Sequence, residues 1–137
     1  PIKIKQLQKG LEQLAEEGSS QIFRRKHNTD TIIGVVGQLQ LEVVKFRLLH
    51  EYGADANFHP MQYTYSRWYR SSDKRKQEEF ESYYRDHIVY DVRGYPMMLF
   101  KSEWEMDYIR GKNPEISFYA SLMNYEKGDG LTDGSGV

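Results

Sequence analysis

The stretch from Thr31 to Gly53, TIIGVVGQLQLEVVKFRLLHEYG, constrains the fold of this chain most, because its periodicity changes partway along. Its opening segment, Thr31–Val36, is rich in β-branched residues, which predicts a strand. After Gly37 the apolar residues recur three and four apart, which predicts a helix that ends at Gly53. A strand that runs directly into a helix leaves an apolar face on each, and the rest of the chain has to cover both.

The predicted helix carries a wide apolar stripe. Its members are spaced three and four apart and are interrupted by charged residues, as in a helix that packs on a core. We expect the whole stripe to be core, with three central residues and three that widen it: Leu41, Val44 and Leu48, then Leu39, Val43 and Phe46.

The residues upstream of this stretch read as a helix followed by a hairpin. Apolar residues at helical spacing predict an amphipathic helix over Lys3–Glu17. Gly10 inside it is unfavourable for a helix by up to about 1 kcal/mol relative to alanine, which indicates close packing at that point. Ser20–Lys26 is predicted to be a strand, and the turn residues His27–Asp30 return the chain antiparallel into Thr31.

Downstream of Pro60 the pattern alternates between strand and helix. Period-two alternation predicts strands, and Ser102 with Glu105 forms a capping box at the start of a helix. In that helix we expect Trp104, Tyr108 and Ile109 to face the core. The predicted elements are a strand Met61–Tyr69, a helix Lys74–His87, strands Ile88–Val92 and Pro96–Lys101, the helix after Ser102, and a strand Glu115–Met123.

These elements predict an α+β fold with ferredoxin-like βαββαβ elements, in which antiparallel sheet is covered by four helices. The second half has the full order, and the first half has the same order without its first strand. Residues 1–125 are expected to be one α/β domain of a larger protein. It is either two tandem units, 1–58 and 61–123, or one fused sheet, and the glycine-rich segment 126–137 is expected to be a flexible tail.

Composition and motifs favour a binding role over catalysis. The 137 residues have a net charge of −1 and no cysteine, which excludes disulfides and thiolate chemistry and fits a reducing cytosol. No apolar run approaches the ~18 residues of a membrane span. The chain has neither G-x-x-x-x-G-K-[ST] nor G-x-G-x-x-G, so neither phosphate-binding loop is present. The spacing of the histidines is not that of metal ligands, and the sequence shows no catalytic constellation. The four histidines are His27, His50, His59 and His87.

One segment partly matches a single-stranded RNA-binding motif. Arg93–Phe100, RGYPMMLF, agrees with the first three positions and the last of the RNA-recognition octapeptide. Pro96 replaces the glycine or alanine, and Met97 replaces an aromatic on which a base would stack. A free-standing RNA-binding module therefore stays an alternative.

Taken together, the segments resemble the C-terminal domain of bacterial peptide chain release factor 3. The family pattern has a QLxKGLxxLxEEG helix, an xxQxFRxxxxxxxIxGxVGxLQFEVVxxRLxxEY hairpin and helix, and an A-R-W strand. Here these appear as Gln6–Gly18, Gln21–Tyr52 and Ser66-Arg67-Trp68, with Leu41 in place of the phenylalanine and serine in place of the alanine. The resemblance continues more weakly to about Tyr119.

The resemblance implies a part of a translational GTPase that promotes departure of class I release factors from the ribosome. GTP or GDP and Mg²⁺ would be bound by an N-terminal domain, which is followed by a β-barrel domain, and neither lies in these residues. This part would be no enzyme and would hold no cofactor. It would dock on small-subunit ribosomal RNA and a ribosomal protein in the cytoplasm, and it would transmit conformational change.

Contacts with ribosomal RNA require cations, because they are directed at phosphates. Charge and placement, and not the resemblance, select the candidates, which are Arg24, Arg25, Lys26, Arg67, Arg70, Lys74 and Arg75. The alternative within the same class is the equivalent domain of a relative of elongation factor G, whose third domain has a similar G-x-L-x-L-E-V core. The LQ in place of LH and the strand at Ser66 argue against it.

Overall fold

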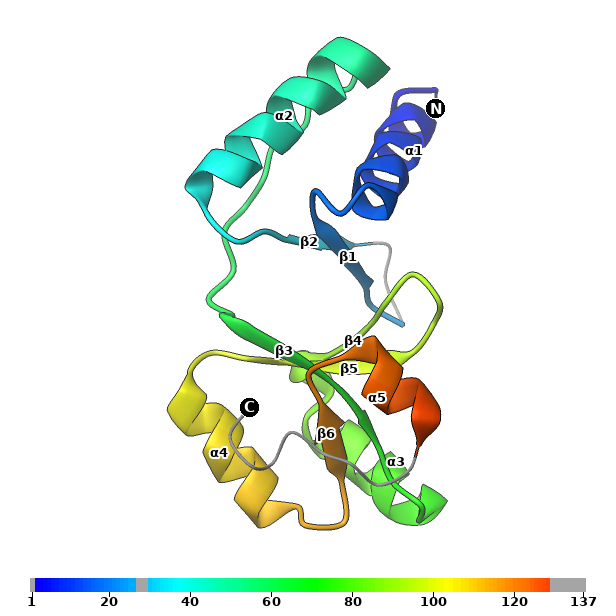
Figure 1. Cartoon of the computed structure of the whole chain (residues 1–137), viewed down its shortest axis with the longest axis vertical. Coiled ribbons are helices and arrows are strands. Elements are labelled where there is room, and N and C mark those ends of the chain that lie inside the picture. Colours follow the sequence, from blue (N-terminus) through cyan, green and yellow to red (C-terminus); the bar gives the residue numbers. More distant parts are fainter. Residues whose placement is uncertain (1, 27–29, 129–137) are drawn as a thin grey trace. The chain divides into compact units, whose positions relative to one another are not determined.

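The computed structural model describes residues 2–26 and 30–128 (Figure 1). It divides the chain into two compact units, Pro1–Pro60 and Met61–Val137, and each is considered by itself. In chain order the elements are α1 (Ile2–Glu16), β1 (Gln21–Arg24), β2 (Thr31–Gly34), α2 (Gln38–Tyr52), β3 (Tyr65–Arg70), α3 (Lys74–Tyr83), the 3₁₀ helix η1 (Arg85–His87), β4 (Ile88–Tyr90), β5 (Pro96–Phe100), α4 (Glu103–Lys112), β6 (Ser117–Tyr119) and α5 (Leu122–Lys127).

The first unit is an antiparallel hairpin, β1–β2, packed with two helices. In the hairpin Ile22 pairs with Ile33 and Phe23 with Ile32. The core is built from α1, β1, α2 and the segment after α2, and its buried members are Leu11, Leu14, Ile22, Val44, Leu48 and Ala54. The helices and strands predicted for this region are therefore confirmed to within a few residues at each end. The turn predicted at His27–Asp30 lies largely outside the described residues.

Two glycines determine how α1 and α2 pack and end. A Cβ added to Gly10 would stand 2.8 Å from Leu48 Cδ2 and 2.9 Å from the Tyr52 ring, so the two helices approach too closely there for any side chain. Gly53 adopts a left-handed conformation with φ +65°, and the Ala54 N–H donates to the Leu48 carbonyl at 2.9 Å. Both glycine predictions are confirmed, because close packing explains the first and a helix C-terminus the second.

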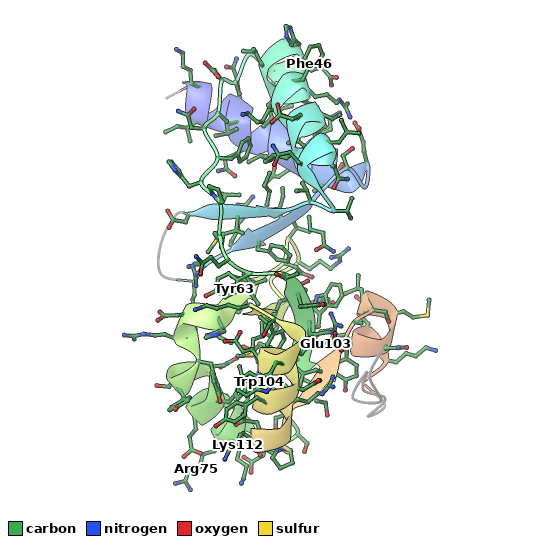
Figure 2. All side chains as sticks on the ribbon, turned by 90° about the vertical axis from the view of Figure 1, so that its left-hand side faces the viewer. Phe46, Tyr63, Arg75, Glu103, Trp104 and Lys112 are labelled. Atoms are coloured by element: carbon green, nitrogen blue, oxygen red, sulfur yellow. The ribbon has the colours of Figure 1, made fainter. Side chains whose placement is uncertain are left out.

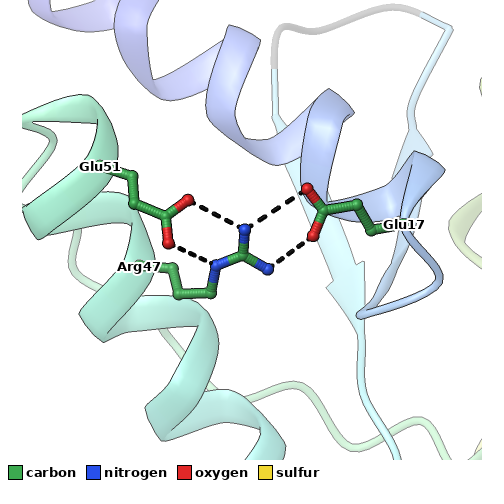
Figure 3. Close-up of polar contacts among 3 residues, drawn as sticks. All are labelled: Glu17, Arg47 and Glu51. Carbon is green, nitrogen blue, oxygen red and sulfur yellow. Dashed lines mark hydrogen bonds and ion pairs between the residues drawn. The ribbon is translucent and has the colours of Figure 1, made fainter.

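Outside that core, one arginine links the end of α1 to α2 (Figure 3). Arg47 donates to both carboxylate oxygens of Glu17, with Nη1 at 2.6 Å and Nη2 at 3.3 Å. It also donates to both oxygens of Glu51, with Nε at 2.7 Å and Nη2 at 2.9 Å. The hydrogen bond from Arg47 lowers the pKa of Glu51, and the two carboxylates raise the pKa of Arg47.

We expect the stabilisation provided by Arg47 to depend on pH. Because the pKa of Glu51 is lowered on folding, this stabilisation is present at neutral pH and is lost as the pH falls through that lowered value. Denaturant titrations should show a stability gap between the wild-type chain and Arg47→Gln that is widest at neutral pH and low salt. The gap should close well below the ordinary glutamate pKa of about 4.3.

The carboxylates of Glu17 and Glu51 are solvent-exposed and the Arg47 side chain is partly exposed, so screening by salt provides an independent check. In about 1 M salt the Debye length is only about 3 Å, and the gap at neutral pH should shrink. Lys45→Gln removes one positive charge from the same helix and is the matched control. A gap for Arg47→Gln that is the same at acid and neutral pH would show that the arginine stabilises by packing alone.

The second unit is a four-stranded antiparallel sheet in the order β4-β5-β3-β6. With the strands in chain order β3, β4, β5 and β6, this is the arrangement of a βαββαβ unit, and the predicted ferredoxin-like α+β fold is confirmed. Tyr65 pairs with Phe100 and Trp68 with Met97, whereas Tyr69 pairs with Phe118 on the other side of β3. Figure 1 shows α3 and α4 below this sheet and α5 at its other side.

Aromatic rings dominate the core between this sheet and the helices α3 and α4. Phe118 lies 6.5 Å from Tyr69, 6.0 Å from Phe80 and 5.8 Å from Phe100 between ring centroids, at angles favourable for tilted and edge-to-face pairs. The Tyr69 hydroxyl donates to Glu81 at 2.7 Å, and burial raises the pKa of this phenol. The remaining buried members are Ile88, Met98, Met106, Ile109 and Ile116.

Local side-chain hydrogen bonds set the ends of the elements. Asp73 accepts from Lys76 N at the start of α3, and Ser102 accepts from Glu105 N at the start of α4. The cap at Ser102 confirms the capping box that the sequence predicts. Buried Asp91 accepts from the N–H groups of Arg93 and Tyr95 and thereby fixes the β4–β5 turn.

Three sequence predictions for this unit are corrected. The strand predicted from Met61 begins only at Tyr65, and the helix predicted to His87 ends at Tyr83 and continues as η1. The strand predicted over Glu115–Met123 ends at Tyr119, because Ser121 caps a further helix, α5. The described residues therefore contain five α-helices where four were expected.

Candidate interaction surfaces

The basic residues predicted at the hairpin are only partly available. Arg24, the last residue of β1, pairs with Glu12 of α1 at 3.1 Å. Arg25 is half-buried and Lys26 is exposed. The turn that follows Lys26 is not among the described residues, so the structure does not test whether these cations gather at a hairpin tip.

Arg67 and Arg70 serve the structure of the second unit. Arg67 donates from Nη1 to the Ser66 carbonyl at 2.8 Å, and its Nε is buried. Arg70 donates from Nη2 to the Tyr125 carbonyl at 2.6 Å, and its guanidinium carbon lies 4.1 Å from the centroid of the Tyr125 ring. Arg70 thus holds α5 against β3, whereas Arg67 is half-buried on β3.

Lys74 and Arg75 are the accessible candidates in the second unit. They lie in the first turn of α3, where cations oppose the helix dipole. The Arg75 side chain is 87 % exposed, and its Nε is 3.8 Å from Glu79, a weak surface pair. Figure 2 shows Arg75 and Lys112 projecting at the same end of this unit.

The exposed face of α4 was missed by the sequence prediction. Trp104 is 72 % and Tyr108 49 % exposed, so the expectation that both are buried is wrong; Ile109 alone is buried as predicted. The two rings stack with centroids 5.2 Å apart and planes 12° apart, and Lys112 Nζ lies 5.6 Å from the Tyr108 centroid. The spacing of four places Trp104, Tyr108 and Lys112 on one face of the helix. Because Met106 and Ile109 already form the inner face, this spacing could have predicted that the first face is exposed.

An open groove of about 520 Å³ adjoins this face between α3 and α4. Phe80, Tyr83, Tyr84 and Tyr108 contribute aromatic surface. Charged and polar side chains of both signs complete its lining: Lys76, Glu79, Lys112, Asn113 and Glu115. Together, Lys74, Arg75, Trp104, Tyr108, Lys112 and this groove are termed the α3–α4 surface.

A second exposed surface lies on α2 in the first unit. Leu39 is 79 % and Phe46 63 % exposed, and Val43 is exposed as well, so the prediction that all three belong to the core is wrong. Val44 and Leu48 are buried as predicted, whereas Leu41 is only half-buried. Figure 2 shows Phe46 at the outer side of α2. The outer stripe is defined as Val36, Leu39, Val43, Phe46 and Leu49, together with His50.

The RNA-recognition octapeptide is not displayed. Met97, at the position where a base would stack, is 1 % exposed on β5, and Met98, Leu99 and Phe100 are buried too. No cluster of metal-binding side chains occurs within the residues that the structure describes. No helix among them is long and apolar enough to cross a membrane.

Fold and surfaces define a mixed α+β domain that exposes one aromatic and cationic surface and one apolar stripe. The family model for the C-terminal domain of class II release factor RF3 matches residues 1–110. The chain belongs to this family, and the resemblance that the sequence indicated is confirmed. The match ends inside α4, so β6 and α5 lie beyond it.

Proposed function

We propose that this chain is the ribosome-docking and conformation-transmitting domain of a translation-termination GTPase that promotes release of class I release factors. The observation that carries the proposal is the match to the RF3 C-terminal domain over residues 1–110, which places the chain in a translation-termination family. GTP or GDP with Mg²⁺ would be bound by an upstream domain, followed by a β-barrel domain. The factor would act in the cytoplasm on small-subunit ribosomal RNA and a ribosomal protein.

The α3–α4 surface is the part of the second unit best suited to such docking. Lys74, Arg75 and Lys76 stand together in the first turn of α3, where they destabilise the helix slightly through its dipole. An RNA phosphate would relieve that repulsion, and exposed Trp104 next to Tyr108 offers a stacking platform worth roughly 1–3 kcal/mol per base. Glu79 and Glu115 in the groove limit the positive potential, so the docking depends on few phosphates.

Charge reversal at the start of α3 tests this. In the full-length factor, Lys74→Glu/Arg75→Glu should weaken binding to ribosomes and reduce the slope of log affinity against log salt by about 2, one for each phosphate contact. The melting temperature should not fall, because glutamate is favoured at a helix N-terminus. Ribosome affinity measured from about 50 to 200 mM salt provides both the affinity and its salt slope.

Lys3→Glu/Lys5→Glu changes the charge equally on α1 and serves as the control. Equal weakening by both pairs would mean long-range attraction and not contact at α3. Arg24→Glu/Arg25→Glu examines the hairpin candidates in the same assay. Unchanged affinity and salt slope for Lys74→Glu/Arg75→Glu would remove the α3–α4 surface from the proposal.

A further inference from the structure

The α3–α4 surface has little net positive charge for a surface that contacts RNA. Two lysines and two glutamates line its groove, so these four charges cancel: Lys76, Lys112, Glu79 and Glu115. A protein that holds an RNA duplex by its backbone needs many cations, because each phosphate contact requires one. The surface therefore offers few phosphate contacts, and another kind of interaction has to supply much of its affinity for RNA.

The other interaction that the surface offers is aromatic stacking. Trp104 and Tyr108 lie one helical turn apart with their planes 12° from parallel, so each ring covers one face of the other. Lys112 follows one turn later, with Nζ 5.6 Å from the Tyr108 centroid. The three side chains thus form a row along the outside of α4, and Figure 2 shows its two ends, Trp104 and Lys112. The indole at the first end is 72 % exposed, so its outer face is open to a further flat ring.

The flat rings of RNA are available only where its bases are unpaired. In a duplex both faces of each base are covered by neighbouring bases, and freeing one face requires unstacking. Unpaired bases in loops and bulges stack on aromatic side chains, and each such contact raises the affinity by about 5- to 150-fold. An open indole face therefore favours single-stranded RNA over duplex RNA.

The groove beside Tyr108 has room for a nucleotide next to the stacked base. Its volume of about 520 Å³ lies within the roughly 300–1,000 Å³ of ligand pockets. α3 contributes Tyr83 to its lining, a ring that is 81 % exposed, and Lys76 and Lys112 add one cation from each helix for a phosphate contact. Eight residues, roughly 12 Å of helix, separate Trp104 from Lys112, so the base contact and the phosphate contact belong to neighbouring nucleotides.

We propose that the α3–α4 surface binds a short single-stranded segment of RNA, with one base stacked on Trp104 and the adjoining nucleotide in the groove. This rests on the proposed function and deepens it, because it names the kind of ribosomal RNA that the domain contacts, which is unpaired nucleotides and not a duplex. The octapeptide on β5 cannot serve such a ligand, since its stacking position is the buried Met97. The exposed rings of α4 provide the stacking that this strand lacks.

Binding of two RNAs by the 137-residue chain tests the proposal. The probes are a fluorescein-labelled single strand of mixed sequence, about eight nucleotides long, and the blunt duplex of the same sequence. The duplex carries twice the phosphates, so charge alone would favour it. The chain should bind the single strand at least about fivefold more tightly. Equal or tighter binding of the duplex, or no binding of the single strand, would overturn the proposal.

Variants at Trp104 locate the contact. Trp104→Leu should weaken binding of the single strand at least about fivefold, with no effect on the duplex or on the melting temperature, because the side chain is exposed. Trp104→Phe keeps a flat ring and should restore most of the affinity. Phe46→Leu removes an exposed ring from the first unit and is the matched control, which should change nothing. A loss for Trp104→Leu no larger than that for Phe46→Leu would overturn the assignment of the stacked base.

Tryptophan fluorescence gives an independent readout of stacking. The chain has two tryptophans, and Trp68 is half-buried, with its Nε1 donating to Asp91 at 3.0 Å. The single strand should therefore quench the emission of Trp104 alone, and Trp104→Leu should abolish the quenching. Quenching that persists in this variant would place the RNA elsewhere and would contradict the proposal.

The full-length factor separates failure of this inference from failure of the proposed function. Stacking releases no counterions, so Trp104→Leu should lower ribosome affinity at least about fivefold at every salt concentration and leave the salt slope unchanged, unlike Lys74→Glu/Arg75→Glu. Unchanged ribosome affinity for Trp104→Leu would overturn the inference and leave the proposed function standing. Absence of ribosome binding by the wild-type factor, with the chain still preferring single-stranded RNA, would overturn the proposed function instead. If Trp104→Leu abolished ribosome binding while the wild-type chain bound neither RNA, the row would contact a ribosomal protein and the inference would fail.

Discussion

Replacing Phe118 with alanine is expected to lower the free energy of unfolding of the second unit by about 3–5 kcal/mol. The side chain is 1 % exposed and its ring lies against those of Tyr69, Phe80 and Phe100, so its removal leaves a cavity lined by rings from β3, α3 and β5. Denaturant titration followed by near-ultraviolet circular dichroism measures the loss directly, because aromatic packing provides that signal.

The matched control is Met123→Ala. Met123 also lies beyond the family match but is exposed on α5, so its replacement should change stability by no more than about 0.5 kcal/mol. A loss for Phe118→Ala as small as that for Met123→Ala would mean that β6 does not contribute to the core.

Replacing Leu48 with alanine is expected to destabilise the first unit by about 2–5 kcal/mol. Leu48 is fully buried between α1 and the rest of its core, and its Cδ2 is the atom nearest to the Cβ position of Gly10. Hydrogen exchange of amides in α1 and α2 should accelerate in the variant, which locates the effect in this unit.

Leu39→Ala makes the same chemical change on the same helix at an exposed position. It should cost no more than about 0.5 kcal/mol in the 137-residue chain. If both leucine variants lost the same stability, the outer stripe would be covered within this chain, and the orientation of α2 described above would be wrong.

Local patterns predicted the elements well because helix and strand depend mostly on near neighbours. The period change after Gly37, the cap at Ser102 and the terminator Gly53 each act through contacts within a few residues, and the structure has all of them. Helix α5 was missed because Ile116, Phe118 and Leu122 keep the alternation of a strand. The turn to a helix depends on one serine, Ser121, whose side chain accepts from Asn124 N.

Sequence predicted less well which face of a helix is buried. On α2 and α4 the apolar residues exceed what one face can hold, and periodicity alone assigns the surplus to the core. Phe46 on α2 and Trp104 on α4 are such surplus residues, and both are exposed. Apolar residues beyond those needed for the core are typical of an interaction surface. The residues wrongly predicted to be buried therefore lie on the candidate surfaces.

The cation candidates were limited for a different reason. Net charge and run length cannot show whether a guanidinium already has a partner. Arg70 is held by Tyr125, which lies 55 residues further along the chain, and no local pattern predicts that contact. Arg75, by contrast, stands at a helix start, where its side chain is 87 % exposed and makes a weak surface pair with Glu79 at 3.8 Å.

The family match ends at residue 110, whereas the fold continues to β6. Trp68, Tyr69 and Arg70 of β3 pair with Tyr119, Phe118 and Ser117, so β6 occupies the sheet border beside β3. A chain cut where the similarity ends would leave the N–H and C=O groups of β3 open along a border flanked by aromatic residues, which is a template for intermolecular strand addition. The folding boundary of this domain is therefore defined by strand pairing, which protects the sheet from self-association and extends beyond residue 110, where the family match ends.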